Sequence, residues 1–72
     1  MELYIFKTDI QNQEKAKALD TVFNKYPSIN RWTIDTEDID KVLRIESLDY
    51  LSENEVIRGI KEIGYNCEVL AY

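Results

Sequence analysis

Few side chains in this sequence of 72 residues are of a type that carries out chemistry. There is no histidine, which removes both the commonest general base and the commonest nitrogen ligand for metals. Without a histidine partner, no serine, threonine or cysteine can form a catalytic triad for acyl transfer. The one cysteine, Cys67, lies two residues before Val69, and the sequence places no cationic group or helix N-terminus beside it. We therefore expect a buried, unreactive thiol and a protein that is not an enzyme.

A run of acidic residues beginning at Asp35 has the length of a calcium-binding loop. Counting from Asp35, Glu46 is the twelfth residue, where such loops place their last ligand. However, Ile39 stands at a position that requires an oxygen ligand, and Asp40 replaces the glycine that the turn needs. We interpret residues 36–40 as the solvated tip of a hairpin, and we predict no bound metal or cofactor.

Length and charge restrict the class of the protein. Seventy-two residues without a long apolar run predict one small domain, residues 1–72. The opening segment is too short and too charged for a signal peptide, and no segment has the roughly 20 apolar residues that cross a bilayer. A lone cysteine suits a reducing compartment, so we expect a cytoplasmic protein. A net charge of −5 repels phosphate groups, which argues against nucleic acids and membranes and favours a cation or a basic protein surface.

The longest helical pattern runs from Asn12 to Tyr26. Apolar side chains recur there at spacings of three and four residues, which gather them on one helical face: Ala16, Leu19, Val22, Phe23 and Tyr26. Asn12 is the predicted N-cap, because its amide oxygen can accept from the free N–H groups of the first turn. Pro27 is predicted to end the helix.

Four other segments are typical of strands. They span residues 2–10, 29–35, 41–47 and 66–70. Ahead of the last one, Ser52 and Glu55 form a capping box that predicts the start of a second helix, with Leu51 packing on Val56 as a hydrophobic staple. Gly64 lies where a left-handed residue would end this helix.

The order strand, helix, strand, strand, helix, strand predicts an α+β, ferredoxin-like βαββαβ fold. Two right-handed crossovers place both helices on one face of a four-stranded antiparallel sheet. The core between sheet and helices is predicted to contain Tyr4, Phe6, Leu19, Phe23, Trp32, Ile34, Leu43, Ile45, Val56, Ile60 and Ile63.

Several stretches follow the pattern of one known family. They are Phe6 to Asn12, then Leu19, Phe23, Tyr26, Pro27 and Ile29, then Trp32, Ile34, Asp35, Leu43 and Ile45, and finally Lys61 to Tyr65. On these residues the sequence resembles, nearly from end to end, the heavy-metal-associated domains of small copper chaperones and copper-transporting ATPases. The resemblance implies the same fold.

The metal motif of that family is Cys-x-x-Cys, whose two thiolates hold Cu(I) because a soft cation prefers sulfur ligands. By the resemblance, Asn12 and Lys15 occupy the two cysteine positions here. A protonated lysine cannot ligate a metal, and its charge repels a cation. We therefore expect no Cu(I) binding by the mechanism of the family.

Lys15 allows two interpretations. It is either a solvated residue left after the motif decayed, or a fixed positive charge that receives an acidic partner group or a small anion. The resemblance places Tyr65 beside the former metal loop, where its hydroxyl would hydrogen-bond near Asn12 and Lys15. The alternative for Tyr65 is a half-buried ring whose hydroxyl reaches water.

The second face of the predicted sheet has no covering layer. We expect it to display the apolar side chains Leu3, Ile5, Val42 and Leu70 among the charged side chains Lys7, Arg31, Arg44, Glu46 and Glu68. Adjacent apolar groups on paired strands favour association, so self-association or docking of a protein partner is one hypothesis, and a solvated face is the other.

Together these patterns predict a non-catalytic interaction module that is related to metallochaperones and has lost its Cu(I) ligands. The alternative is a metal-binding or metal-transport protein with atypical ligands such as Cys67, Tyr65 and carboxylates.

Overall fold

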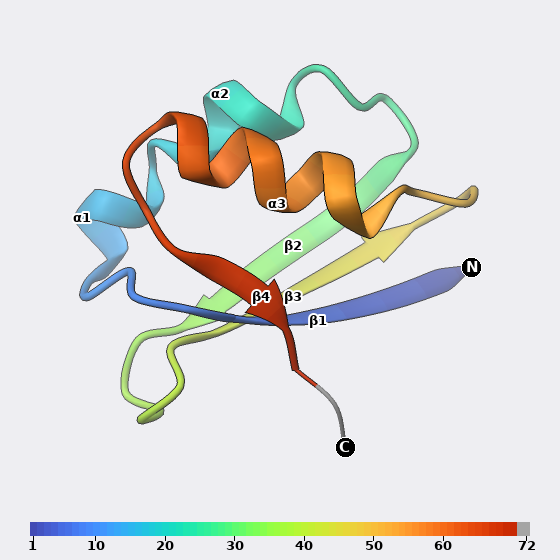
Figure 1. Ribbon diagram of the computed structural model, residues 1–72. Coiled ribbons are helices and arrows are strands. Elements are labelled where there is room, and N and C mark those ends of the chain that lie inside the picture. Colours follow the sequence, from blue (N-terminus) through green and yellow to red (C-terminus); the bar gives the residue numbers. More distant parts are fainter. Residues whose placement is uncertain (71–72) are drawn as a thin grey trace.

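The computed structural model describes residues 1–70, which form one four-stranded sheet with helices on a single face (Figure 1). The strands are β1 (Glu2–Thr8), β2 (Ile29–Asp35), β3 (Val42–Ser47) and β4 (Cys67–Val69), and the helices are α1 (Gln13–Ala16), α2 (Leu19–Phe23) and α3 (Glu53–Glu62). The strand order is β2-β3-β1-β4, and each neighbouring pair is antiparallel. This arrangement confirms the predicted ferredoxin-like fold. No helix within residues 1–70 is long and apolar enough to cross a membrane.

The predicted helix from Asn12 to Tyr26 is wrong as a single element, because it is divided into α1 and α2. At the division, the N–H groups of Lys17 and Ala18 donate to carbonyls three residues earlier instead of four. These are the tighter turns of a 3₁₀-helix, whose period is three residues. Three of the four steps in the apolar series of this segment are also three residues long. Either kind of turn therefore keeps the apolar side chains against the sheet, and the spacing could not distinguish them.

The second helix, α3, begins after its predicted cap and ends before its predicted left-handed glycine, whereas β3 and β4 are shorter than predicted. Ser52 caps α3 by accepting a hydrogen bond from the N–H of Glu55 at 3.4 Å. After α3, Gly64 has a φ of 99°, its N–H donates to Lys61, and the N–H of Tyr65 donates to Ile60. This pair of hydrogen bonds is a Schellman motif, which needs a left-handed residue and so favours glycine.

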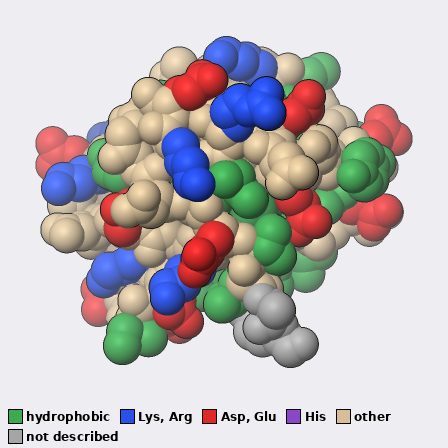
Figure 2. Space-filling model, viewed as in Figure 1, with side chains coloured by type: hydrophobic (Ala, Val, Ile, Leu, Met, Phe, Trp, Pro, Cys, Tyr) green, Lys and Arg blue, Asp and Glu red, His purple; other side chains and the backbone are tan. Residues whose placement is uncertain are grey.

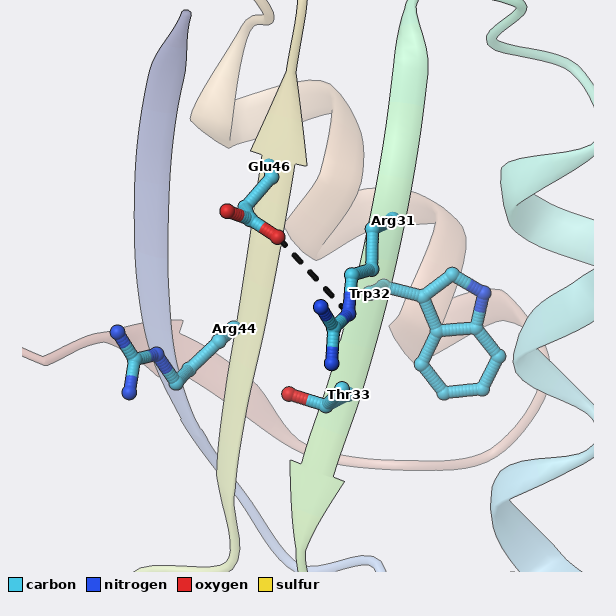
Figure 3. A pocket seen from close by; sticks show the side chains of 5 residues that line it. All are labelled: Arg31, Trp32, Thr33, Arg44 and Glu46. Atoms are coloured by element: carbon cyan, nitrogen blue, oxygen red, sulfur yellow. Dashed lines mark ion pairs between the residues drawn. The ribbon is translucent and has the colours of Figure 1, made fainter.

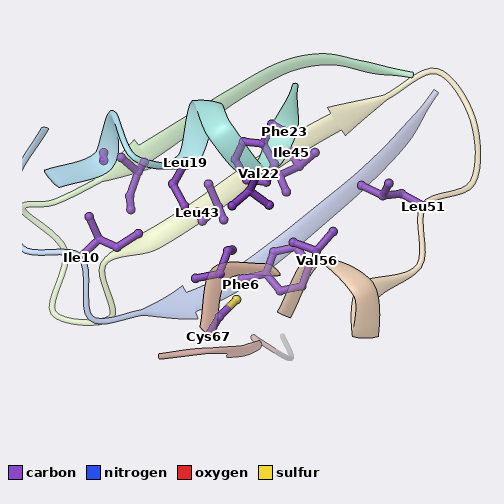
Figure 4. Packing of buried hydrophobic residues seen from close by; sticks show 13 residues of the cluster. Phe6, Ile10, Leu19, Val22, Phe23, Leu43, Ile45, Leu51, Val56 and Cys67 are labelled. Carbon is purple, nitrogen blue, oxygen red and sulfur yellow. The ribbon is translucent and has the colours of Figure 1, made fainter. Parts of the chain in front are cut away.

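The core lies between the sheet and the helices (Figure 4). Eight of the eleven predicted core residues are buried, and the exceptions Tyr4, Trp32 and Ile63 are half-buried around its margin. The hydroxyl of Tyr4 explains its partial exposure, since it accepts a hydrogen bond from the N–H of Leu51 at 2.9 Å. The predicted core list omitted five buried members of the cluster: Ile10, Ala16, Val22, Leu51 and Cys67.

The acidic segment after β2 is a hairpin tip, as predicted. The carboxylate of Asp35 accepts from the N–H groups of Glu37 and Asp38, and the carboxylate of Asp38 accepts from Asp40. Lys41 ends the turn with a φ of 46°, and its ammonium donates to the carbonyl of Thr36 at 2.7 Å. Two of the carboxylates therefore hold the backbone of the turn.

Candidate functional site

The β1–α1 loop and the first turn of α1 hold Asn12 and Lys15, the two residues that the sequence resemblance places at the cysteine positions of the Cys-x-x-Cys motif. Asn12 caps α1, and its side-chain oxygen accepts from the N–H of Lys15 at 2.8 Å. Both side chains are exposed. The N-cap prediction is confirmed, and the amide oxygen of Asn12 is already engaged with the backbone.

Tyr65 does not join this loop by a hydrogen bond among the described residues. Its ring is half-buried and packs against the core cluster, and its backbone N–H donates to the carbonyl of Ile60 at the end of α3. The structure therefore agrees with the interpretation of Tyr65 as a half-buried ring. The expected hydrogen bond of its hydroxyl near Asn12 and Lys15 is absent from residues 1–70.

A different pair ties the β1–α1 loop to the end of the chain. The carboxylate of Asp9 accepts from the backbone N–H of Asn66 and from its side-chain amide, both at 2.9 Å. Sequence reasoning missed this pair. The register of β1 on β4 contains the signal: Thr8 is paired with Cys67, so the residues just beyond them, Asp9 and Asn66, face each other.

Cys67 lines a pocket of about 360 Å³ beside this loop. Its lining residues are Lys7, Thr8, Asp9, Lys61, Asn66, Cys67 and Glu68. The thiol is buried, and burial is the main reason that its pKa rises from 9.0 to about 12, with Lys61 lowering it and Glu68 raising it. The expectation that Cys67 is buried is confirmed.

These residues do not fit a Cu(I) site of the two-thiolate kind. Cys67 is the only cysteine in the sequence, and its thiol is protonated at neutral pH. Asp9 is engaged with Asn66, and two lysines also line the pocket. Within residues 1–70, no three side chains of His, Cys, Asp or Glu are grouped so that they could hold a metal ion.

The uncovered sheet face is the second candidate site. Strand pairing arranges its side chains in rows: Arg31 with Glu46 and Leu3 in the first, and Thr33 with Arg44 and Ile5 in the second. A further row pairs Asp35 with Val42 and Lys7 with Glu68. The N–H of Leu70 donates to the carbonyl of Ile5 at 3.0 Å, which places Leu70 at the end of the second row.

Val42 does not contribute to this face in the way expected. Its side chain is only 9% exposed, although the pairing directs it away from the core. Asp35 is its partner on β2, and an ion pair between Lys7 and Asp40, 3.7 Å long, lies at the same end of the sheet. The alternation of side chains along a strand shows which face of the sheet a residue lies on, but it does not show how far neighbouring side chains cover that residue. Leu3, 51% exposed, and Ile5, half-buried, remain as the accessible apolar pair.

Next to Leu3 and Ile5 lies a hollow of about 250 Å³, which we call the arginine hollow. It is lined by Arg31, Trp32, Thr33, Arg44 and Glu46 (Figure 3). The ring of Trp32 points away from it toward the helices, where it meets Phe23 edge to face at 5.2 Å. Polar and charged side chains therefore dominate this hollow.

The comparisons with known proteins concern the fold. No family model matches the sequence, and no curated protein matches it. A chain from a structure described as "Crosstalk between Cu(I) and Zn(II) homeostasis" has a TM-score of 0.78 and 10% identity, over 97% of this chain and 100% of that one. The yeast copper transporter domain Ccc2a, solved in its apo and Cu(I)-loaded states, has a TM-score of 0.80 and 11% identity, over 99% of this chain and 97% of that one. The chain therefore shares its βαββαβ fold with a copper transporter domain.

Proposed function

We propose that this chain is a non-catalytic, cytoplasmic protein-interaction module that has the fold of copper-handling domains but does not carry Cu(I). The observation that supports this most directly is the state of Cys67, the only cysteine, whose buried thiol has a pKa of about 12. Cu(I) in a two-coordinate site requires two soft donors, normally thiolates. Cys67 supplies one sulfur where two are required, and that sulfur is a protonated thiol where a thiolate is required.

The β1–α1 loop supports the same proposal. Asn12 presents an amide oxygen that already accepts a hydrogen bond, and Lys15 brings a positive charge to the first turn of α1. An amide oxygen is a hard ligand, and an ammonium has no lone pair to donate. Lys15 remains available as a solvated residue or as a contact for an acidic group, and the two roles differ only when a partner is present.

The reactive side chains of this protein also support a role without catalysis. A nucleophilic cysteine needs a lowered pKa, and that of Cys67 is raised. The groups exposed on the open sheet face include the apolar side chain of Leu3 and the guanidinium groups of Arg31 and Arg44, which are suited to contacts with another protein.

Titration of the reduced protein with Cu(I), in competition with a chromophoric chelator, tests this proposal. We expect the wild-type protein to leave the chelator complex unchanged, as the Cys67→Ala variant does. If the wild-type protein instead removed one equivalent of Cu(I) and Cys67→Ala did not, the alternative would hold: a metal-binding protein with Cys67 and other atypical ligands.

A further inference from the structure

The arginine hollow on the open sheet face has an excess of positive charge in a chain whose net charge is −5. Two guanidinium groups and one carboxylate line it. Figure 2 shows, on another side of the molecule, that basic and acidic side chains are interspersed around a short run of hydrophobic ones. The excess in the hollow is therefore a local feature, and it is opposite in sign to the whole protein.

The one carboxylate engages Arg31 only weakly. The nearest contact joins Nε of Arg31 to an oxygen of Glu46 at 4.0 Å, and the Arg31 side chain is 70% exposed. Exposed ion pairs of this kind contribute about 0 to 1 kcal/mol. Figure 3 shows the guanidinium of Arg31 lying over Thr33, whose hydroxyl points into the space between β2 and β3. Arg31 can therefore exchange Glu46 for a better-placed acceptor at little cost.

Arg44 forms no ion pair with any described residue. Its cross-strand neighbours are Thr33 on β2 and Ile5 on β1, and neither carries a charge. In Figure 3 its side chain leaves β3 toward β1, away from Arg31 and Glu46. A guanidinium presents several N–H donors in a plane that matches a carboxylate. The donors of Arg44 face solvent next to the apolar side chain of Ile5.

We propose that the arginine hollow binds an extended acidic segment of a partner protein, with carboxylates on Arg31 and Arg44 and an apolar side chain on Leu3 and Ile5. This inference rests on the proposed function and adds the surface and the chemistry of the partner. Alternate residues of an extended segment are about 6.6 to 6.8 Å apart and point to the same side. Two acidic residues separated by one residue therefore direct both carboxylates toward the same face, where one can meet Arg31 and the other Arg44.

The described part of the open face carries no aromatic side chain, which distinguishes an acidic peptide from a nucleic acid. Single-stranded nucleic acids bind by stacking bases on aromatic rings and by tracking a broad positive groove. Here the rows of the open face contain aliphatic, charged and threonine side chains, and the net charge of the protein is negative. A short acidic segment needs only the local positive charge.

The probe is the peptide acetyl-Glu-Thr-Glu-Thr-Leu-amide, added at low salt to the isotope-labelled full chain, with its glutamine counterpart as the matched control. We expect the acidic peptide to shift the amide signals of Arg31, Thr33 and Arg44, and high salt to weaken its binding. Arg44→Gln should weaken binding about fivefold or more, whereas Arg58→Gln, which removes an exposed arginine from α3, should not. Arg44→Lys keeps the charge and loses the planar donors, so its affinity for the peptide should lie between those of Arg44→Gln and Arg58→Gln. This variant keeps the test valid even if Arg44→Gln folds poorly.

Three results would overturn the inference. One is the absence of peptide-dependent shifts in the hollow, including the case in which the shifts occur at Asn12 and Lys15 instead. Another is an oligothymidylate that binds the hollow more tightly than the peptide. The third is a dimer without peptide that Leu3→Lys abolishes, which would assign the face to a second copy of the chain. Because Cu(I) titration is a separate measurement, a failed peptide test leaves the proposed function standing, and Cu(I) binding would refute that function whatever the peptide does.

Discussion

Asp9 and Asn66 join the two loops at one end of the sheet through a pair of hydrogen bonds, each 2.9 Å long. One partner follows β1 and the other precedes β4, which has only three residues. A strand of three residues has few hydrogen bonds of its own with which to hold its place. The Asp9–Asn66 pair therefore acts as an additional attachment of β4 to the sheet.

Replacing Asp9 by alanine should lower the free energy of unfolding by about 1 to 2 kcal/mol, because the two hydrogen bonds are charge-assisted but exposed. Urea denaturation measures the change. Asp49→Ala is the matched control, since Asp49 is also an exposed aspartate in a loop. Equal stability of the Asp9 and Asp49 variants would show that the attachment contributes nothing.

Gly59 lies where α3 passes close to α2. A Cβ added at this position would be 2.9 Å from Cγ1 of Val22, which is buried and stiff at χ1. Gly59→Ala should therefore lower stability by about 1 to 3 kcal/mol, even though alanine favours the helix by roughly 1 kcal/mol. In a Val22→Ala background the clash is absent, so the same change should be stabilising. If Gly59→Ala stabilised the wild-type protein as well, the predicted close approach would be wrong.

Phe23 packs edge to face on Trp32, with ring centres 5.2 Å apart and an angle of 60° between the rings. Phe23→Ala should cost about 3 to 5 kcal/mol, a large share of the stability of so small a domain. Trp32 fluorescence and far-UV circular dichroism will show whether the variant is unfolded or folded with a lower midpoint. Lys25→Ala, an exposed change two residues away, should have little effect. A Phe23→Ala protein as stable as wild type would mean that the core is misplaced.

Cys67 should make stability depend on alkaline pH. The pKa of its thiol is 9.0 in the ordinary case and about 12 in the folded protein, so the unfolded chain releases the proton first as the pH rises. The contribution of the protonated thiol to the free energy of unfolding is fully present below about pH 9 and is lost toward pH 12, at up to about 1.4 kcal/mol per pH unit. Cys67→Ala removes this group, and its stability should fall less steeply over the same range than that of wild type. Parallel pH profiles for the two proteins would contradict the raised pKa.

The topology could be predicted from the sequence, because apolar residues recur with the period of a strand or a helix in each segment. The residues at the boundaries of these segments are also of types that favour caps and turns. Ser52 and Gly64 are examples, since each has a single conformational role that the structure shows. The division of the first helix could not be predicted, because a step of three residues suits both kinds of turn. The burial of Val42 and the Asp9–Asn66 pair depend on which side chains lie beside one another across strands. That information becomes available only with the register of the sheet.

The central proposal is that this chain has the fold of copper-handling domains but does not carry Cu(I). It is tested most directly by Cu(I) titration of wild type beside the double variant Asn12→Cys, Lys15→Cys, in competition with a chelator. The account predicts that the double variant takes up one Cu(I), because it gains two cysteines in Cys-x-x-Cys spacing at the start of α1. Wild type should take up none. One equivalent of Cu(I) bound to the wild-type protein as tightly as to the double variant would contradict the claim.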